Sequence, residues 1–145
     1  MKIFAILVFL CFATETLAQD FEEGQAWSYQ TRDHEPDSRL LIYKIDEFPE
    51  GTKIFSIVIT NVGLKIPTSE VRMQTFIAHI PITETGLKSS VLEEVETFDP
   101  YPETSEGYDN WKTAFEKGTG GVFELQIKEI IGVIEATMGN GKIDP

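Results

Sequence analysis

Alternation of hydrophobic and polar residues predicts a strand with one buried face near residue 27, whereas residues 53–66 begin with a run that is apolar on both faces, as in a central strand. Trp27, Tyr29 and Thr31 alternate with polar neighbours, so a first strand is expected over residues 25–31 with both aromatic rings in the core. Three further strands are expected over residues 38–48, 53–66 and 73–82. Pro81 restricts the last of these to an edge or an end of the sheet, because proline cannot donate to a neighbouring strand.

Turn-forming residues separate the expected strands. Pro36 stands among acidic residues and ends the first strand. Residues 49–52 read Pro-Glu-Gly-Thr, which predicts a turn. Residues 61–63 read Asn-Val-Gly, which predicts a bulge or bend near the end of the third strand.

From residue 83 the hydrophobic spacing changes from two residues to three or four. Leu87, Val91, Leu92 and Val95 form one stripe of an amphipathic helix, for which Thr83 is a candidate N-cap. This spacing predicts a helix over residues 83–95.

A second helical stripe consists of Tyr108, Trp111 and Phe115, with Ser105 as a candidate cap and Gly118 as a stop signal. Three rings at this spacing are the usual way to close a small sheet, and we interpret them as core. The alternative interpretation is a ligand groove lined by the same rings.

The end of the chain predicts one more strand. Phe123, Leu125 and Ile127 alternate with polar residues, so a fifth strand is expected over residues 123–128. Periodicity does not decide whether residues 129–138 extend that strand or form a helix, and residues 139–145 are expected to fray. The order β-β-β-β-α-α-β predicts an α+β fold, with an antiparallel sheet of about five strands packed on two helices.

Residues 1–18 have the organisation of a secretory signal peptide. Lys2 is followed by an apolar run over residues 3–13 and by small residues that end at Ala18, after which cleavage is expected. Ala13 is a second candidate for the cleavage position. The apolar run is shorter than the roughly 20 residues of a membrane-spanning helix, so no stable membrane insertion is expected after signal removal. Residues 19–145 are then expected to form a single domain.

Cysteine content agrees with bacterial export. The single cysteine, Cys11, lies within the expected signal, and the bulky residues before it argue against a lipoprotein. The remaining chain has no cysteine for a disulfide and no Asn-X-Ser/Thr site. These features favour a periplasmic or secreted bacterial protein.

The charge limits the classes of partner. The net charge is −12, and Lys and Arg do not cluster anywhere in the sequence. This composition argues against binding to nucleic acid or to anionic membranes. An acidic surface that keeps the protein soluble is the simplest interpretation.

Residues 32–37 hold the one segment in which arginine, histidine and acids coincide. His34, next to Glu35, could act as an acid or base there, and Arg32 could bind an anionic group. The alternative is a solvated turn in which Arg32 pairs with Glu35 or Asp37.

His79 lies in the apolar segment FIAHIPI of the fourth strand. A buried hydrogen bond to a backbone carbonyl is the simplest role, and a functional pair with Glu35 is the alternative. If the first and fourth strands end side by side, His34 and His79 could bind a metal together with Glu35 or Asp37. Their spacing matches no zinc pattern, so neither a metal nor a cofactor is expected.

The loop over residues 96–110 is acidic and invites a calcium interpretation in an exported protein. It lacks the D-x-D-x-D-G spacing of an established calcium loop. A solvated acidic loop is therefore expected.

Three blocks of sequence are similar to a family of small exported bacterial proteins of uncharacterised function. They are GQAWSYQTRDHEPDSRLLIYKID at 24–46, AHIPITETGLKSSV at 78–91 and EGYDNWKTAFEKGTGGVF at 106–123. The resemblance implies a shared fold and exported or membrane-adjacent homologues. It supplies no catalytic residue, cofactor or partner.

No catalytic motif points to a reaction. The sequence contains no G-x-S-x-G, H-E-x-x-H, Walker or dinucleotide-binding motif. We therefore expect a non-enzymatic exported domain that binds a protein or small ligand near residues 32–37. The alternatives are a hydrolase or metal-dependent enzyme that uses Arg32, His34, Glu35 and His79, and a structural accessory of an envelope complex.

Overall fold

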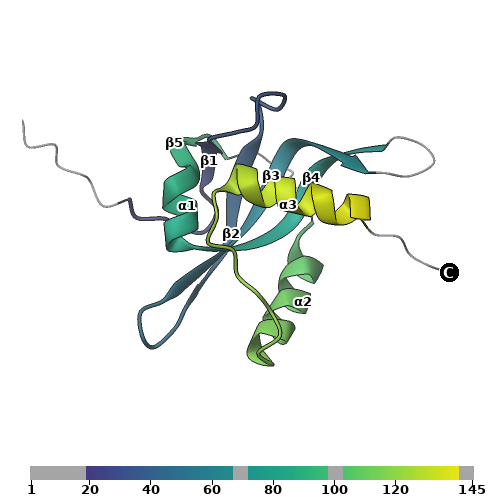
Figure 1. The fold of residues 1–145 in the computed structure, drawn as a ribbon. Helices are drawn as coiled ribbons and strands as arrows, with labels where there is room; N and C mark the ends of the chain where they lie inside the picture. The colour runs from purple at the N-terminus through teal and green to yellow at the C-terminus, as the bar shows by residue number, and fades with distance from the viewer. Residues whose placement is uncertain (1–18, 67–71, 98–102, 141–145) are drawn as a thin grey trace, which may run out of the picture.

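In the part of the chain that the structure describes, a five-stranded antiparallel sheet packs with three helices (Figure 1). The structure is a computed structural model, and it describes residues 19–66, 72–97 and 103–140. The strands are β1 (Ala26–Tyr29), β2 (Arg39–Glu47), β3 (Lys53–Ile66), β4 (Arg72–Thr83) and β5 (Val91–Val95), and the helices are α1 (Glu84–Ser90), α2 (Ser105–Glu116) and α3 (Ile127–Asn140). The α+β fold class is confirmed. The expected signal peptide at residues 1–18 lies outside the described residues.

The strands lie in the order β4-β3-β2-β1-β5, so β4 and β5 are the two edges of the sheet. The expected turn at residues 49–52 joins β2 to β3, and Gly51 has a φ of 86° there, which glycine adopts without strain. The expected bulge is also confirmed, because the β3–β4 register shifts between Thr60 and Leu64 and Asn61 has a φ of 53°. Pro81 lies on the edge strand β4, as its missing N–H requires.

Helices α1 and α3 pack on one face of the sheet and close the main core (Figure 1). That core contains Trp27 and Tyr29 of β1, which confirms their expected role. The other face carries a small cluster of Ala26, Leu41 and Val58. Helix α2 packs against β4, apart from the other two helices.

The helix expected over residues 83–95 is only half correct. Thr83 is the N-cap, since its hydroxyl accepts the Gly86 N–H, but α1 ends at Ser90. Val91 then adopts extended angles, and residues 91–95 pair with β1 as the fifth strand. Leu92 is consequently exposed instead of sharing a buried stripe with Leu87.

The strand expected over residues 123–128 is wrong. Phe123 makes one isolated bridge to Ile82, and α3 begins at Ile127. The Glu129 carboxylate accepts the Gln126 N–H, an arrangement that starts a helix. From Ile127 onward, isoleucines recur at helical spacing and face the core. Residues 129–138, for which strand and helix were both possible, are therefore helical.

None of the helices in the described part of the chain is long and apolar enough to cross a membrane.

Candidate functional site

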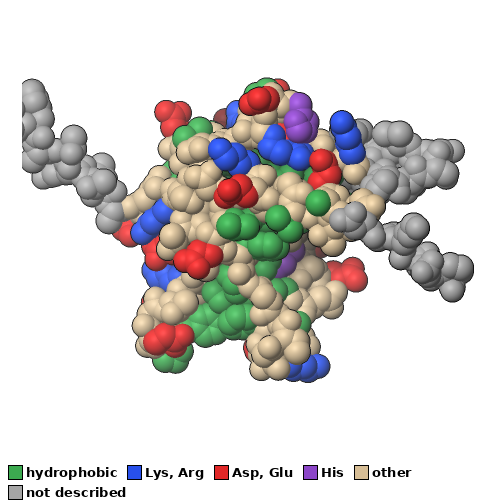
Figure 2. All heavy atoms as spheres, viewed as in Figure 1, with side chains coloured by type: hydrophobic (Ala, Val, Ile, Leu, Met, Phe, Trp, Pro, Cys, Tyr) green, Lys and Arg blue, Asp and Glu red, His purple; other side chains and the backbone are tan. Residues whose placement is uncertain are grey.

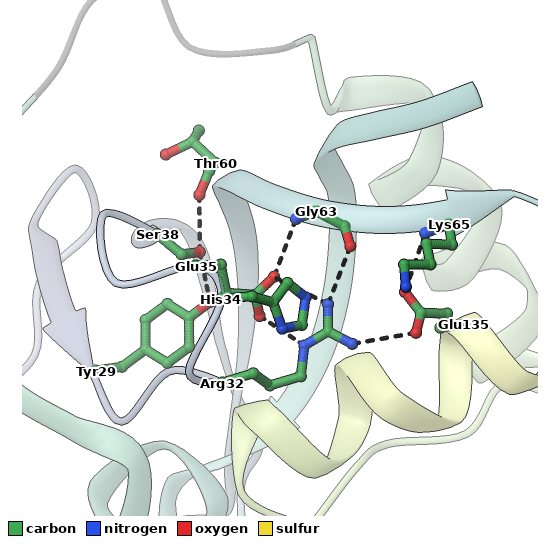
Figure 3. A network of polar contacts seen from close by, with 9 residues as sticks. All are labelled: Tyr29, Arg32, His34, Glu35, Ser38, Thr60, Gly63, Lys65 and Glu135. Atoms are coloured by element: carbon green, nitrogen blue, oxygen red, sulfur yellow. Dashed lines mark hydrogen bonds and ion pairs between the residues drawn. The ribbon is translucent and has the colours of Figure 1, made fainter. Parts of the chain in front are cut away.

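The charged turn after β1 holds an ion pair between Arg32 and Glu35 (Figure 3). Arg32 donates from Nε to Glu35 Oε1 at 2.8 Å and from Nη2 to Oε2 at 2.9 Å, so the pair is bidentate. The Glu35 side chain is only 2% exposed. The predicted local pairing of Arg32 with Glu35 is therefore confirmed.

The same pair ties the turn to two distant elements. Glu35 Oε2 also accepts the Gly63 N–H at 2.9 Å, and Arg32 donates to the Gly63 carbonyl at 3.3 Å. Arg32 further reaches Glu135 of α3 at 3.4 Å, while Glu135 accepts the Lys65 N–H. We call Arg32, Glu35, Gly63 and Glu135 the Arg32 clamp, because they join the turn, the β3 bulge and α3 (Figure 3).

The charges in the clamp stabilise each other. Burial alone would raise the pKa of Glu35, but the Arg32 hydrogen bonds and the Gly63 N–H outweigh it and hold that pKa below its usual range. The hydrogen bonds to Glu35 in turn raise the pKa of Arg32. Both groups thus remain charged, and their polar atoms are used within the fold.

A second polar chain fixes the other end of this turn. The Tyr29 hydroxyl lies 2.5 Å from Ser38 Oγ, which donates to the Thr60 carbonyl at 2.8 Å. Burial raises the pKa of Tyr29 to about 12. Tyr29 therefore stays neutral and acts as a buried structural contact.

His34 is the exposed member of the predicted site. Its side chain is 53% exposed, and its Nε2 lies 3.7 Å from Glu35 Oε2, beyond hydrogen-bond distance. The structure thus brings Arg32, His34 and Glu35 together. It leaves His34 as the one of the three that faces solvent.

His79 lies far from this turn in the sheet. β1 and β4 are separated by β2 and β3, so the two strands do not end side by side. The condition under which His34 and His79 could meet is therefore not fulfilled. Within the described residues, no three His, Cys, Asp or Glu side chains gather closely enough to bind a metal ion.

A bulge in β4 places His79 on the face opposite to the main core. Ile57 pairs with Ile80 and Ile59 pairs with Ile77, so β4 has one extra residue between these pairs. Ile77 joins the main core, and His79 turns to the other face, where its Nε2 lies 3.0 Å from Ser56 Oγ. His79 was expected to bond to a backbone carbonyl, but its partner is the hydroxyl of Ser56.

Around His79, six rings form what we call the aromatic cluster. Its members are Tyr43, Phe48, His79, Tyr108, Trp111 and Phe115. The ring centroid of His79 lies 5.5 Å from that of Trp111 and 6.1 Å from that of Tyr108. Trp111 is buried, whereas the other five rings are half-buried. The predicted core position is therefore correct for Trp111, whereas Tyr108 and Phe115 are partly exposed to solvent.

Asp46 of β2 connects the sheet to α2 beside this cluster. It pairs with Lys112 Nζ at 2.6 Å and accepts the Tyr108 hydroxyl at 3.2 Å. Burial and the Asp46 carboxylate raise the pKa of Tyr108 to about 12. Burial lowers the pKa of His79 to about 4, and Asp46 opposes that shift only in part.

Ser56 and His79 have the separation of a nucleophile and its base, but their surroundings do not suit that chemistry. Ser56 is fully buried, so a substrate cannot reach its hydroxyl. Asp46 bonds to Tyr108 and Lys112 instead of orienting the imidazole. The pair is a satisfied, partly buried hydrogen bond within the fold.

Gly107 allows α2 to approach the sheet closely. A Cβ at this position would lie 2.9 Å from the Cβ of His79. Thr104 at the start of α2 also donates its hydroxyl to the carbonyl of Ala78, which lies in the β4 bulge. Helix α2 thus packs against two neighbouring residues of the β4 bulge, the side chain of His79 and the carbonyl of Ala78.

Replacing Gly107 by alanine is expected to destabilise the protein by about 1–2 kcal/mol, because two backbone-fixed Cβ atoms would collide and α2 must shift. Gly132→Ala in α3 is the matched control, since nothing lies within 4 Å of a Cβ there. Alanine is the better helix former, so this control is expected to gain about 0.5–1 kcal/mol. Chemical denaturation measures both, and changes of the same sign would contradict the close packing of α2.

Sequence reasoning missed Ser56, Asp46 and Gly107, which all act through contacts with distant segments. No local pattern indicated them. A serine in an otherwise apolar central strand was the one available signal, because a buried hydroxyl needs a partner.

Comparisons of the chain with protein-family models, curated proteins and solved structures found no match.

Proposed function

We propose that this protein is an exported, non-enzymatic interaction domain of a bacterium, and that it binds a protein partner through the aromatic cluster. The observation that carries the proposal is the cluster itself, in which five half-buried rings lie around the buried Trp111 and three of them, His79, Tyr108 and Phe115, contact it directly. Aromatic side chains with rigid neighbours make effective anchors at interfaces, because they bury large areas at low entropic cost.

The surroundings of the cluster favour an apolar segment of the partner. Figure 2 shows hydrophobic side chains gathered between the β2–β3 hairpin and α2. A hollow of about 260 Å³ is lined by Gly121, Val122 and Phe123. It borders the cluster, because the Gly121 carbonyl accepts the indole N–H of Trp111 at 2.8 Å. A hydrophobic side chain of the partner would fit beside these rings.

The turn over residues 32–37 is less suited to this role. The Arg32 guanidinium and the Glu35 carboxylate bond to each other and to β3 and α3. A partner would have to break those bonds in order to use them. We therefore place the interaction surface at the aromatic cluster.

A photo-crosslinking residue in place of Phe115 tests the interaction in producing cells. We expect one discrete protein adduct, because Phe115 is a half-buried member of the cluster. The same crosslinker in place of Val133 is the control, because Val133 is 46% exposed on α3, outside the cluster. The absence of an adduct from position 115, or equal adducts from both positions, would contradict the proposed surface.

Export is tested separately by mass spectrometry of the protein recovered from the envelope and the medium. Cleavage after Ala18 would give a chain that starts at Gln19. An uncleaved chain that remains in the cytoplasm would rule out the exported location.

A further inference from the structure

Helix α2 docks against a half-buried histidine that lies between charged and aromatic neighbours. His79 lies on β4 and bonds to Ser56 of β3, while Tyr108 and Trp111 of α2 contact its ring. Gly107 of α2 lies directly over its Cβ. Removing α2 would therefore expose more of the imidazole to water.

Among the residues that the structure describes, none supplies an unpaired counter-charge to an imidazolium at this place. The titratable and charged groups that face His79 are Asp46 from β2 and Tyr108 and Lys112 from α2, whereas β3 contributes the neutral Ser56. Asp46 is already paired with Lys112 at 2.6 Å. Tyr108 is neutral, because its pKa is raised to about 12. A positive charge on His79 would thus be poorly compensated while α2 is in place.

Helix α2 is the helix with the fewest buried residues, since α1 buries Gly86, Leu87 and Ser90. Trp111 is its one buried residue, while α3 buries Ile127, Ile130 and Ile131 in the main core. Its remaining ties are the hydrogen bonds and ring contacts described above. The sheet and the other two helices share a core to which α2 contributes nothing.

We propose that α2 is an acid-released cover of the sheet: protonation of His79 detaches α2, while the sheet, α1 and α3 stay folded. Detachment separates Tyr108, Trp111 and Phe115 from Tyr43, Phe48 and His79, so the aromatic cluster is divided. The consequence for a partner rests on the proposed function, because acid would then dismantle the interaction surface. The detachment itself requires no partner.

The sign of the effect follows from the two states of His79. Its pKa is about 4 with α2 docked and returns to the ordinary 6.5 when the ring is hydrated. The undocked form therefore binds more protons, and docking weakens as the pH falls below 6.5. Between pH 7 and pH 4 this difference favours undocking by up to about 100-fold.

Hydrogen exchange of the purified protein, read by mass spectrometry, tests this inference without a partner. After correction for intrinsic rates, protection of residues 105–116 is expected to fall by up to about 100-fold between pH 7 and pH 4, with β3 unchanged. In His79→Gln, which keeps a hydrogen-bonding side chain but does not titrate, the fall is expected to be less than about 3-fold. The exposed His34 supplies the matched control, since His34→Gln is expected to behave as the wild type.

Two outcomes would overturn the proposal. One is a loss of protection in α2 and β3 together, which is global unfolding. The other is an equal loss in His79→Gln, which would assign the effect to another group such as Asp46. If His79→Gln does not fold, the ring of His79 is titrated by NMR in the wild type, and its protonation must coincide with the loss of α2 protection. A missing crosslink from position 115 would contradict the proposed function and leave this result unaffected.

Discussion

Replacing Glu35 by glutamine is expected to lower the free energy of unfolding by about 3 kcal/mol. The substitution removes the carboxylate from a side chain that is 2% exposed, and it leaves the Arg32 guanidinium without its bidentate partner. The Gly63 N–H also loses a charged acceptor. Urea denaturation at pH 7 measures the loss directly.

The pH dependence of this difference provides a second check. The pKa of Glu35 in the folded protein lies below its ordinary value of 4.5, so the carboxylate contributes stability that is fully present above pH 4.5. That contribution is lost as the pH falls through the folded-state pKa. The wild type and Glu35→Gln should therefore converge in stability at low pH.

Glu124→Gln is the control, because Glu124 is exposed and lies outside the Arg32 clamp. It is expected to change the free energy of unfolding by less than about 0.5 kcal/mol. A similarly small change in Glu35→Gln would show that the clamp does not hold the turn.

The strands β1 to β4 could be predicted because apolar and β-branched residues fill each segment and turn residues separate the segments. Burial alternates only in part, since β3 is buried on both faces over residues 54–59, as expected for a central strand. The fifth strand could not. Residues 91–95 carry a helical stripe of apolar residues, but the exposed edge of β1 pairs with them and Leu92 turns outward. Over residues 123–127 the alternation coincides with the start of a longer helical stripe, and burial of Ile130 and Ile131 beyond it decides the outcome. Tertiary contacts outweighed the local pattern in both segments.

The candidate site was predictable only where its contacts are local. Arg32 and Glu35 are three residues apart and pair within one turn, whereas Gly63 and Glu135 join them from other elements. For His79, one extra residue in β4 reversed the face on which the ring lies, since a strand alternates its side chains at every residue. Sequence periodicity does not reveal a bulge of this kind unless glycine or asparagine marks it.

Replacing Trp111 by alanine is expected to destabilise the docking of α2 by about 3 kcal/mol. The change removes the one buried side chain of α2, its ring contacts with His79 and Phe115, and the indole N–H bond to the Gly121 carbonyl. The main core contains no residue of α2, so the sheet should remain folded. Hydrogen exchange is expected to show loss of protection in residues 105–116 with β3 unchanged.

Trp111→Phe separates the contribution of the ring from that of the hydrogen bond. Phenylalanine keeps an aromatic ring in the cluster but leaves the Gly121 carbonyl without its donor, so a loss of about 1 kcal/mol is expected. The crosslink from position 115 should survive in Trp111→Phe and disappear in Trp111→Ala, because the partner requires a docked α2 in the proposed function. A crosslink that persists in Trp111→Ala while α2 is unprotected would show that the partner recognises the helix alone, and not the cluster that the helix forms with the sheet.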